Sequence, residues 1–81
     1  MSGATLKELS EIFEEVVDLS GIVFERAAVL GDDVPVDSKE MLRIFSRIEA
    51  EYRFRFDPKD VLTLKTVGDL LEIIRCRRAG T

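Results

Sequence analysis

The residue pair with the clearest chemical potential is Asp37-Ser38, which follows Pro35 at the start of an amphipathic stretch. Asp37 is a favourable N-cap, and Glu40 completes a capping-box pattern with aspartate in the usual Ser/Thr place. The pattern predicts Ser38 at the first helical position, where Asp37 caps the helix and leaves the Ser38 hydroxyl free. A phosphate on that hydroxyl would be stabilised by the unpaired N–H groups and the dipole of the helix.

Other chemistry has little support in this sequence. The chain contains no histidine, which excludes a histidine-dependent triad or general base. Carboxylates are plentiful, but no spacing places two of them in one pocket. The single Cys76 excludes an internal disulfide, and a zinc site held by the protein alone is not expected without histidine. We expect a half-buried Cys76, no catalytic residue, no metal site and no enzyme activity in the chain itself.

The helix that begins at Ser38 carries an apolar stripe. Its members repeat at helical spacing, and Met41 and Ile44 widen the same face. They are Leu42, Phe45, Ile48 and Tyr52. The periodicity predicts an amphipathic helix over about 38–52 with this stripe facing a core.

Several segments in this order resemble the acyl carrier protein family. They are Asp37-Ser38, the Ile-Glu-x-Glu-Tyr run that ends at Tyr52, the acidic segment 57–61, and Thr66-Val67-Gly68-Asp69-Leu70. The resemblance covers about 30–74 well and the N-terminal helix by pattern only. In that family the serine after the aspartate carries 4′-phosphopantetheine.

The resemblance implies that a phosphopantetheinyl transferase attaches this arm to Ser38 from coenzyme A, with Asp37 beside it as the helix cap. A thioester on the arm would then hold an acyl group for acyl-loading and acyl-using enzymes. Tethering raises the local concentration of the acyl group at each partner's active site. In the family, an apolar seam between the second, third and fourth helices can shelter the acyl chain, and each buried CH₂ contributes roughly 0.8 kcal/mol.

The exposed face of this helix departs from the family. Lys39 stands where leucine is usual, and Arg43 and Arg47 stand where acidic or neutral residues are usual. With Glu40 they predict a partner-binding surface of mixed charge, which docks weakly on the basic patches of general fatty-acid synthesis enzymes. This favours a specialised carrier with dedicated partners in a lipid or secondary-metabolite pathway. The alternative is that these bases only pair with glutamates of the same helix.

Length and composition predict one small domain over residues 1–81. A chain with 46% hydrophobic and 35% charged residues is typical of a folded helical protein. No apolar run is long enough to cross a bilayer, and the N-terminus does not resemble a signal peptide, so we expect a cytoplasmic monomer. The net charge is −4, and residues 1–37 hold nine acids against two bases. This balance disfavours nucleic-acid binding.

Three further helices are predicted from N-cap residues and apolar stripes. They cover about 6–19, 58–62 and 67–77, after Thr5, Asp57 and Thr66 respectively. We expect Gly21 to cap the first helix, and Val61 and Leu62 to face inward from the short one. The predicted fold class is therefore all-α, a small four-helix bundle of acyl-carrier type with three longer helices and one short helix.

The long loop between helices I and II contains apolar residues broken by turn signals. Phe24, Val29 and Leu30 are candidates to pack against the bundle, and a short helix over 24–29 is an alternative.

A second connection follows Arg53, which stands where the family commonly turns with glycine. Tyr52, Phe54 and Phe56 alternate with arginines here, a pattern that we interpret as an extended connector burying alternate side chains. A stacking platform for single-stranded nucleic acid is the alternative.

Two other hypotheses belong to different functional classes. An unmodified four-helix interaction module would keep the carrier fold and bind a partner through Lys39, Arg43 and Arg47. An anion-binding domain would use the arginines of 75–78, which the net acidic charge of the chain disfavours.

Overall fold

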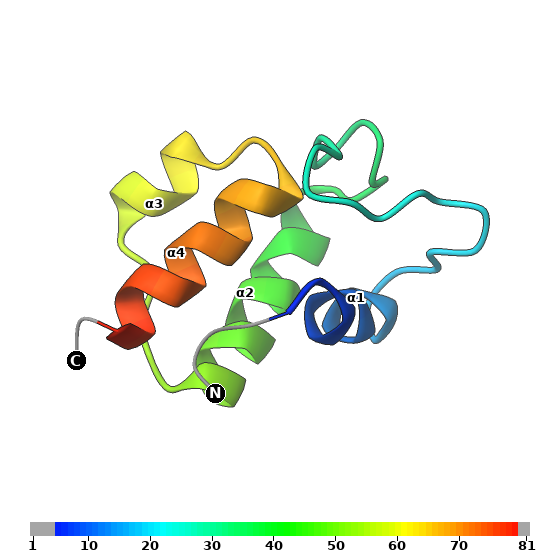
Figure 1. Cartoon of the computed structure of the whole chain (residues 1–81). Helices are drawn as coiled ribbons and strands as arrows, with labels where there is room; N and C mark the ends of the chain where they lie inside the picture. Colours follow the sequence, from blue (N-terminus) through cyan, green and yellow to red (C-terminus); the bar gives the residue numbers. More distant parts are fainter. Residues whose placement is uncertain (1–4, 80–81) are drawn as a thin grey trace.

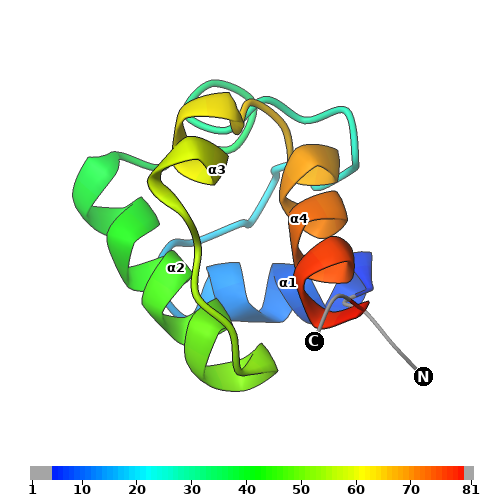
Figure 2. The same cartoon turned by 90° about the vertical axis from the view of Figure 1, so that its left-hand side faces the viewer.

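The computed structural model describes residues 5–79, with the backbone alone at 78 and 79. Four helices follow one another along the chain (Figure 1): α1 (Leu6–Glu14), α2 (Ser38–Tyr52), α3 (Pro58–Thr63) and α4 (Val67–Ala79). In the view of Figure 2, α2 and α4 lie on opposite sides, α1 lies below them and α3 above. Within the described residues the structure contains helices and two isolated bridges but no strand. The predicted all-α class is confirmed.

Local capping hydrogen bonds start the helices where the sequence predicts. In α1, the Glu8 N–H donates to Thr5 Oγ1 at 3.1 Å, and the Thr5 N–H donates to Glu8 Oε1 at 3.2 Å. The same reciprocal pair joins Thr66 and Asp69 before α4, at 3.1 and 3.2 Å. These pairs satisfy N–H groups that a helix start leaves without a partner.

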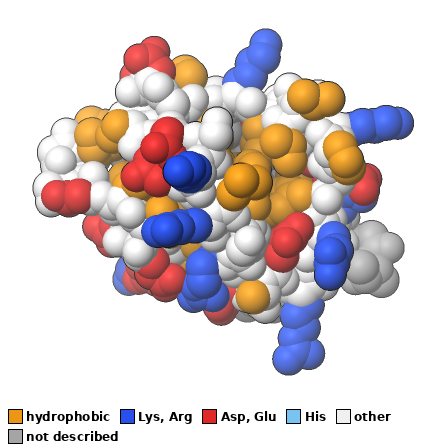
Figure 3. Space-filling model, turned by 180° about the vertical axis from the view of Figure 1, so that it is seen from behind, with side chains coloured by type: hydrophobic (Ala, Val, Ile, Leu, Met, Phe, Trp, Pro, Cys, Tyr) orange, Lys and Arg blue, Asp and Glu red, His pale blue; other side chains and the backbone are white. Residues whose placement is uncertain are grey.

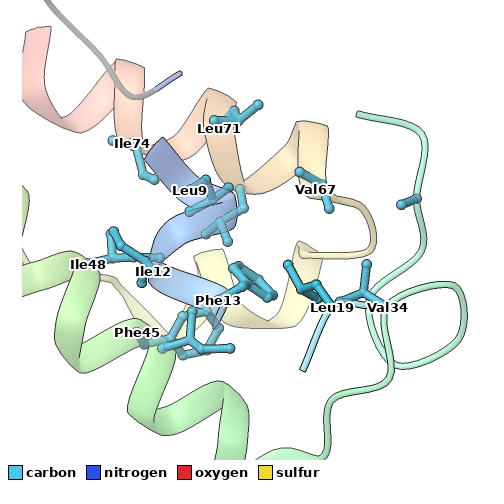
Figure 4. Packing of buried hydrophobic residues seen from close by; sticks show 13 residues of the cluster. Leu9, Ile12, Phe13, Leu19, Val34, Phe45, Ile48, Val67, Leu71 and Ile74 are labelled. Atoms are coloured by element: carbon cyan, nitrogen blue, oxygen red, sulfur yellow. The ribbon is translucent and has the colours of Figure 1, made fainter. Parts of the chain in front are cut away.

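The core lies where α1, α2 and α4 meet the long connection between α1 and α2 (Figure 4). The helices contribute Leu9, Ile12, Phe13, Ile44, Phe45, Ile48, Val67, Leu70, Leu71 and Ile74, and the connection contributes Leu19, Ala28 and Val34. Full burial of one such Leu, Ile or Phe side chain contributes roughly 1.5–3 kcal/mol. The core thus fixes α2, and with it the residue at its first position.

Helix α1 ends at Glu14, and the predicted end at Leu19 is wrong. The N–H groups of Val16 and Val17 both bond to the Phe13 carbonyl, at 3.0 and 2.8 Å, which turns the chain. The Asp18 carboxylate then accepts the Ser20 N–H at 2.9 Å, and such a local bond competes with continued helix. Gly21 does adopt a positive φ of 76°, but in the turn that follows rather than as the cap of α1.

The long connection packs against the bundle through Phe24 and Leu30, as predicted. The ring of Phe24 meets the ring of Phe13 edge to face with centroids 5.1 Å apart, and Leu30 is half-buried. The prediction for Val29 is wrong, since that side chain is 38% exposed.

The alternative of a short helix over 24–29 is also wrong, because backbone bonds hold this segment beside the start of α4. The Val67 N–H donates to the Ala28 carbonyl at 3.0 Å, and the Leu30 N–H donates to the Lys65 carbonyl at 2.9 Å. These bonds use backbone groups that a helix would otherwise pair internally.

Three apolar side chains expected to face the core are exposed instead. Leu42 is 64% exposed on α2, and Val61 and Leu62 are 43% and 83% exposed on α3. Helix α3 buries no residue at all. It is held instead by Arg77 of α4, whose Nη2 lies 2.6 Å from Asp57 Oδ2 and 2.5 Å from Asp60 Oδ2. Leu42 and Val61 are turned to an open groove described below.

The connector after α2 follows its prediction, since Tyr52, Phe54 and Phe56 are partly buried while the arginines between them are exposed. Phe56 stacks at a tilt on Phe45 with ring centroids 4.9 Å apart. By contrast, Cys76 is exposed rather than half-buried. At about 100° per residue it lies on the opposite side of α4 from the buried Ile74. Among the described residues, no helix combines the length and apolar character needed to span a bilayer.

Candidate functional site

Ser38 is the first residue of α2, and its side chain is exposed. Asp37 caps the helix as predicted: the Glu40 N–H donates to Asp37 Oδ1 at 2.8 Å, and the Asp37 N–H donates to Glu40 Oε1 at 2.9 Å. Within residues 5–79, the Ser38 hydroxyl takes part in no hydrogen bond. The hydroxyl is therefore open to a reagent from solvent at the positive end of a 15-residue helix.

An open apolar groove of about 370 Å³ begins beside Ser38. It is lined by side chains from α2, from α3, from the α1–α2 connection and from the α3–α4 connection. They are Leu30, Val36, Met41, Leu42, Phe45, Val61 and Leu64, and Gly31, Asp37 and Ser38 also border the groove. Figure 3 shows hydrophobic side chains gathered between α2 and α3 on the face seen from behind Figure 1. The expected seam between the second, third and fourth helices differs in one respect. Among the side chains that the structure describes, none from α4 lines this groove, whereas Leu30, Gly31 and Val36 of the α1–α2 connection do.

Gly31 shapes the rim of the groove. Its φ of 89° lies in the left-handed region that favours glycine, and its N–H donates to the Val34 carbonyl at 2.8 Å. This turn brings Leu30 and Val36, on either side of it, to the groove wall.

The four residues predicted to bind partners differ in what their side chains contact. Lys39 and Arg43 are exposed on the outward face of α2. Glu40 is half-buried in the capping box, and Arg47 is held by carboxylates at the end of α1 and on α2 itself. The bond from Arg47 lowers the pKa of the Glu15 carboxyl below its usual value and raises that of the Arg47 guanidinium.

Sequence reasoning missed several features of this region. The groove residues Val36 and Leu64 were not singled out, and neither was the pairing of Arg47 with Glu15. The signal for that pair is the uneven charge of the chain, with acids concentrated before residue 38 and bases after it. That asymmetry favours ion pairs between the two parts but does not identify the partners.

Comparison of the chain with known proteins shows the family to which it belongs. Residues 7–74 match the family model described as "Phosphopantetheine attachment site". The chain is 32% identical over 72 residues to the acyl carrier protein of Rhodococcus erythropolis, covering 86% of this chain and 77% of that protein. It is 35% identical over 69 residues to the meromycolate extension acyl carrier protein of Mycolicibacterium aurum, covering 83% and 69%. The acyl carrier protein of Renibacterium salmoninarum is 32% identical over 74 residues, which cover 91% of each chain. No solved structure matches the chain significantly.

The chain therefore belongs to the acyl carrier protein family, whose members are carriers rather than enzymes. It carries acyl groups on a covalently attached 4′-phosphopantetheine. Members of this family interact with acyl-handling enzymes and with a phosphopantetheinyl transferase. The residues at the start of α2 fit such a group, because an exposed hydroxyl without an internal partner lies next to an apolar groove.

Proposed function

We propose that Ser38 is the attachment residue and that the chain delivers its acyl cargo to dedicated enzymes of a specialised lipid or secondary-metabolite pathway. The exposed Ser38 hydroxyl at the capped start of α2 is the observation that carries the proposal. The similarity to carriers that include a meromycolate extension acyl carrier protein supports a lipid pathway.

The loading step follows from the chemistry of a hydroxyl and a pyrophosphate. In the transferase, Ser38 Oγ gives its proton to a base that the transferase supplies and attacks the pyrophosphate phosphorus that bears the pantetheine arm. A new P–O bond forms to Oγ, the pyrophosphate P–O bond breaks, and adenosine 3′,5′-bisphosphate leaves. The Glu40 N–H is already bound to Asp37, so the N–H groups of Ser38 and Lys39 would stabilise the resulting phosphodiester. Asp37 supports this step by fixing the start of the helix.

The groove beside Ser38 would shelter the acyl chain between deliveries. Its wall is apolar and includes the half-buried Met41 and Leu64. Because each CH₂ removed from water contributes roughly 0.8 kcal/mol, a chain of several carbons gains enough to stay in the groove until a partner withdraws it.

The chain itself would catalyse no reaction and would act as a cytoplasmic monomer. Partners would meet Lys39 and Arg43 on the outward face of α2. Glu40 and Arg47 would contribute by positioning that helix, because their side chains already bind groups within the chain.

The proposal is tested by intact mass after incubation with coenzyme A, Mg²⁺ and a promiscuous phosphopantetheinyl transferase. The wild-type chain and the control Ser46→Ala should each gain one phosphopantetheine, whereas Ser38→Ala should gain none. Ser46 is a matched control because it is also exposed on α2. Modification of Ser38→Ala, or no gain in a folded wild-type chain, would contradict the proposal and favour an unmodified interaction module.

A further inference from the structure

The outward face of α2 carries basic side chains and no acidic one. At about 100° per residue, Lys39 and Arg43 point away from the buried Ile44 and Ile48. Arg53, also exposed, continues this line at the C-terminal end of the helix. Within residues 5–79, none of the three forms an ion pair. We call Lys39, Arg43 and Arg53 the basic ridge.

The acidic residues of α2 are bound elsewhere. Glu40 accepts the Asp37 N–H at 2.9 Å, Glu49 accepts the Phe56 N–H at 2.9 Å, and Glu51 accepts from Arg47 at 3.4 Å. The three carboxylates keep their charge, but at about 100° per residue they lie on the flanks of α2 and not on its outward face. The outward face itself therefore presents only the basic ridge to an approaching protein.

An apolar anchor lies beside the basic ridge. Leu42 is 64% exposed, one turn after Ser38 on α2 and next to Arg43 in sequence. A protein that reaches for a group on Ser38 meets Lys39, Leu42 and Arg43 on the same helix. Leu42 is the outer edge of the groove wall, and with Val61 across the groove it forms an exposed apolar patch beside these bases. Contiguous apolar patches rimmed by polar residues are typical of protein–protein contact sites.

We infer that the basic ridge and Leu42 dock on an acyl-handling enzyme whose active-site entrance has an acidic rim and an apolar recess. This inference rests on the proposed function. Complementary charge speeds encounter by roughly 10–10³-fold at low salt. The exposed Glu8, Glu11 and Glu14 lie on another helix, α1, and the same acidic rim would repel them. This repulsion favours the orientation in which α2 faces the partner.

The test measures binding of the full chain, without its arm, to a defined enzyme. The chain is labelled on Cys76, its single and exposed thiol, and binding is followed by fluorescence anisotropy. The probe is a malonyl transferase of bacterial fatty-acid synthesis whose docking patch is basic, used both unchanged and with that patch reversed to glutamate. We expect the wild-type chain to bind the glutamate form about tenfold more tightly at low salt, and the advantage to shrink as salt rises.

Charge reversal of the ridge should invert this preference. Lys39→Glu/Arg43→Glu should favour the unchanged, basic enzyme, whereas Lys7→Glu/Arg26→Glu, with the same change in net charge away from α2, should keep the wild-type order. Circular dichroism must show that both variants remain folded. The inference is overturned if the wild-type chain prefers the basic enzyme, or if the ridge variant behaves as its control does. The inference is also overturned if the wild-type chain binds single-stranded DNA or anionic phosphatidylglycerol vesicles more tightly than it binds the glutamate form of the enzyme.

This design separates the inference from the proposed function. Binding of the chain without its arm does not depend on modification of Ser38, which the mass measurement tests independently.

Discussion

Arg47 binds Glu15 through two parallel hydrogen bonds, from Nε to Oε1 at 2.7 Å and from Nη2 to Oε2 at 3.1 Å. The pair joins the C-cap of α1 to α2. Arg47 Nη1 also reaches Glu51 Oε1 at 3.4 Å. A bidentate arginine–carboxylate pair has a fixed geometry, so Arg47 holds α1 against the helix that presents Ser38.

Replacing Arg47 with alanine should therefore affect packing more than docking. We expect Arg47→Ala to lower the melting temperature at low salt, and the difference to shrink in about 1 M NaCl because exposed ion pairs are screened. Arg43→Ala, which breaks no ion pair, is the matched control and should melt as the wild type does. Thermal unfolding by circular dichroism at both salt concentrations measures this. Identical melting of the two variants at low salt would show that the Arg47–Glu15 pair does not stabilise the fold.

Arg53 ends α2 in a left-handed conformation, with φ 60° and ψ 55°. A side chain with a Cβ atom is strained there, and glycine is not. Arg53→Gly should therefore raise the free energy of unfolding by about 0.5–1 kcal/mol, as measured by urea denaturation. Ala50→Gly, in the regular part of α2, should instead lower it by about 1 kcal/mol. Destabilisation by Arg53→Gly would show that the arginine side chain makes a compensating interaction.

Asp69 gives the stability of the chain a defined pH dependence. Backbone N–H bonds, first from Thr66 and then from Lys65, lower the pKa of its carboxyl. Because the pKa is lower in the folded state, the ionised carboxylate contributes stability above the unfolded-state pKa, and this contribution is lost as pH falls through the folded-state pKa.

Asp69→Asn should thus melt below the wild type at pH 7, and the two curves should converge as pH falls from about 5 toward 2. Thermal melts across this range provide the measurement. Glu11→Gln, at an exposed carboxylate of α1, serves as the control. A constant gap between Asp69→Asn and wild type at all pH values would contradict the assignment.

Two neighbouring residues of α3 offer a test of the groove. Val61 lines it and Leu62 does not, although Leu62 is the more exposed of the two, at 83% against 43%. Loading the arm with an octanoyl group should raise the melting temperature, because a cargo bound only by the folded state stabilises it. We expect Val61→Asn to reduce that gain and Leu62→Asn to leave it unchanged. Equal gains in both variants would place the acyl chain outside the groove.

Features set by neighbours in sequence were predictable from the residues alone. The capping boxes at Thr5, Asp37 and Thr66 join groups three residues apart, and each forms in the structure. The bounds of α2 follow from its cap and its apolar period. The position of Ser38 at the helix start, on which the proposed site depends, belongs to this local class.

Features set by distant packing were not predictable in the same way. The Arg47–Glu15 pair spans 32 residues of chain, and no local pattern selects it. Apolar periodicity predicts that Leu42 and Val61 lie on the apolar face of their helices. It does not distinguish a face buried in the core from a face that lines an open groove. The early end of α1 lies at the turn where the Val16 and Val17 N–H groups both bond to the Phe13 carbonyl, although the apolar helical pattern continues through Leu19.

The measurement that tests the central claim most directly is the location of the arm on chain purified from the cells that make it. Trypsin cleavage after Arg26 and Lys39 releases residues 27–39, in which Ser38 is the only hydroxyl-bearing residue. A missed cleavage at Lys39 extends the peptide to Arg43 without adding another hydroxyl. Our account predicts that this peptide carries one phosphopantetheine and that fragmentation places it on Ser38. An arm on any other peptide, or a chain that carries none in cells with an active transferase, would contradict it.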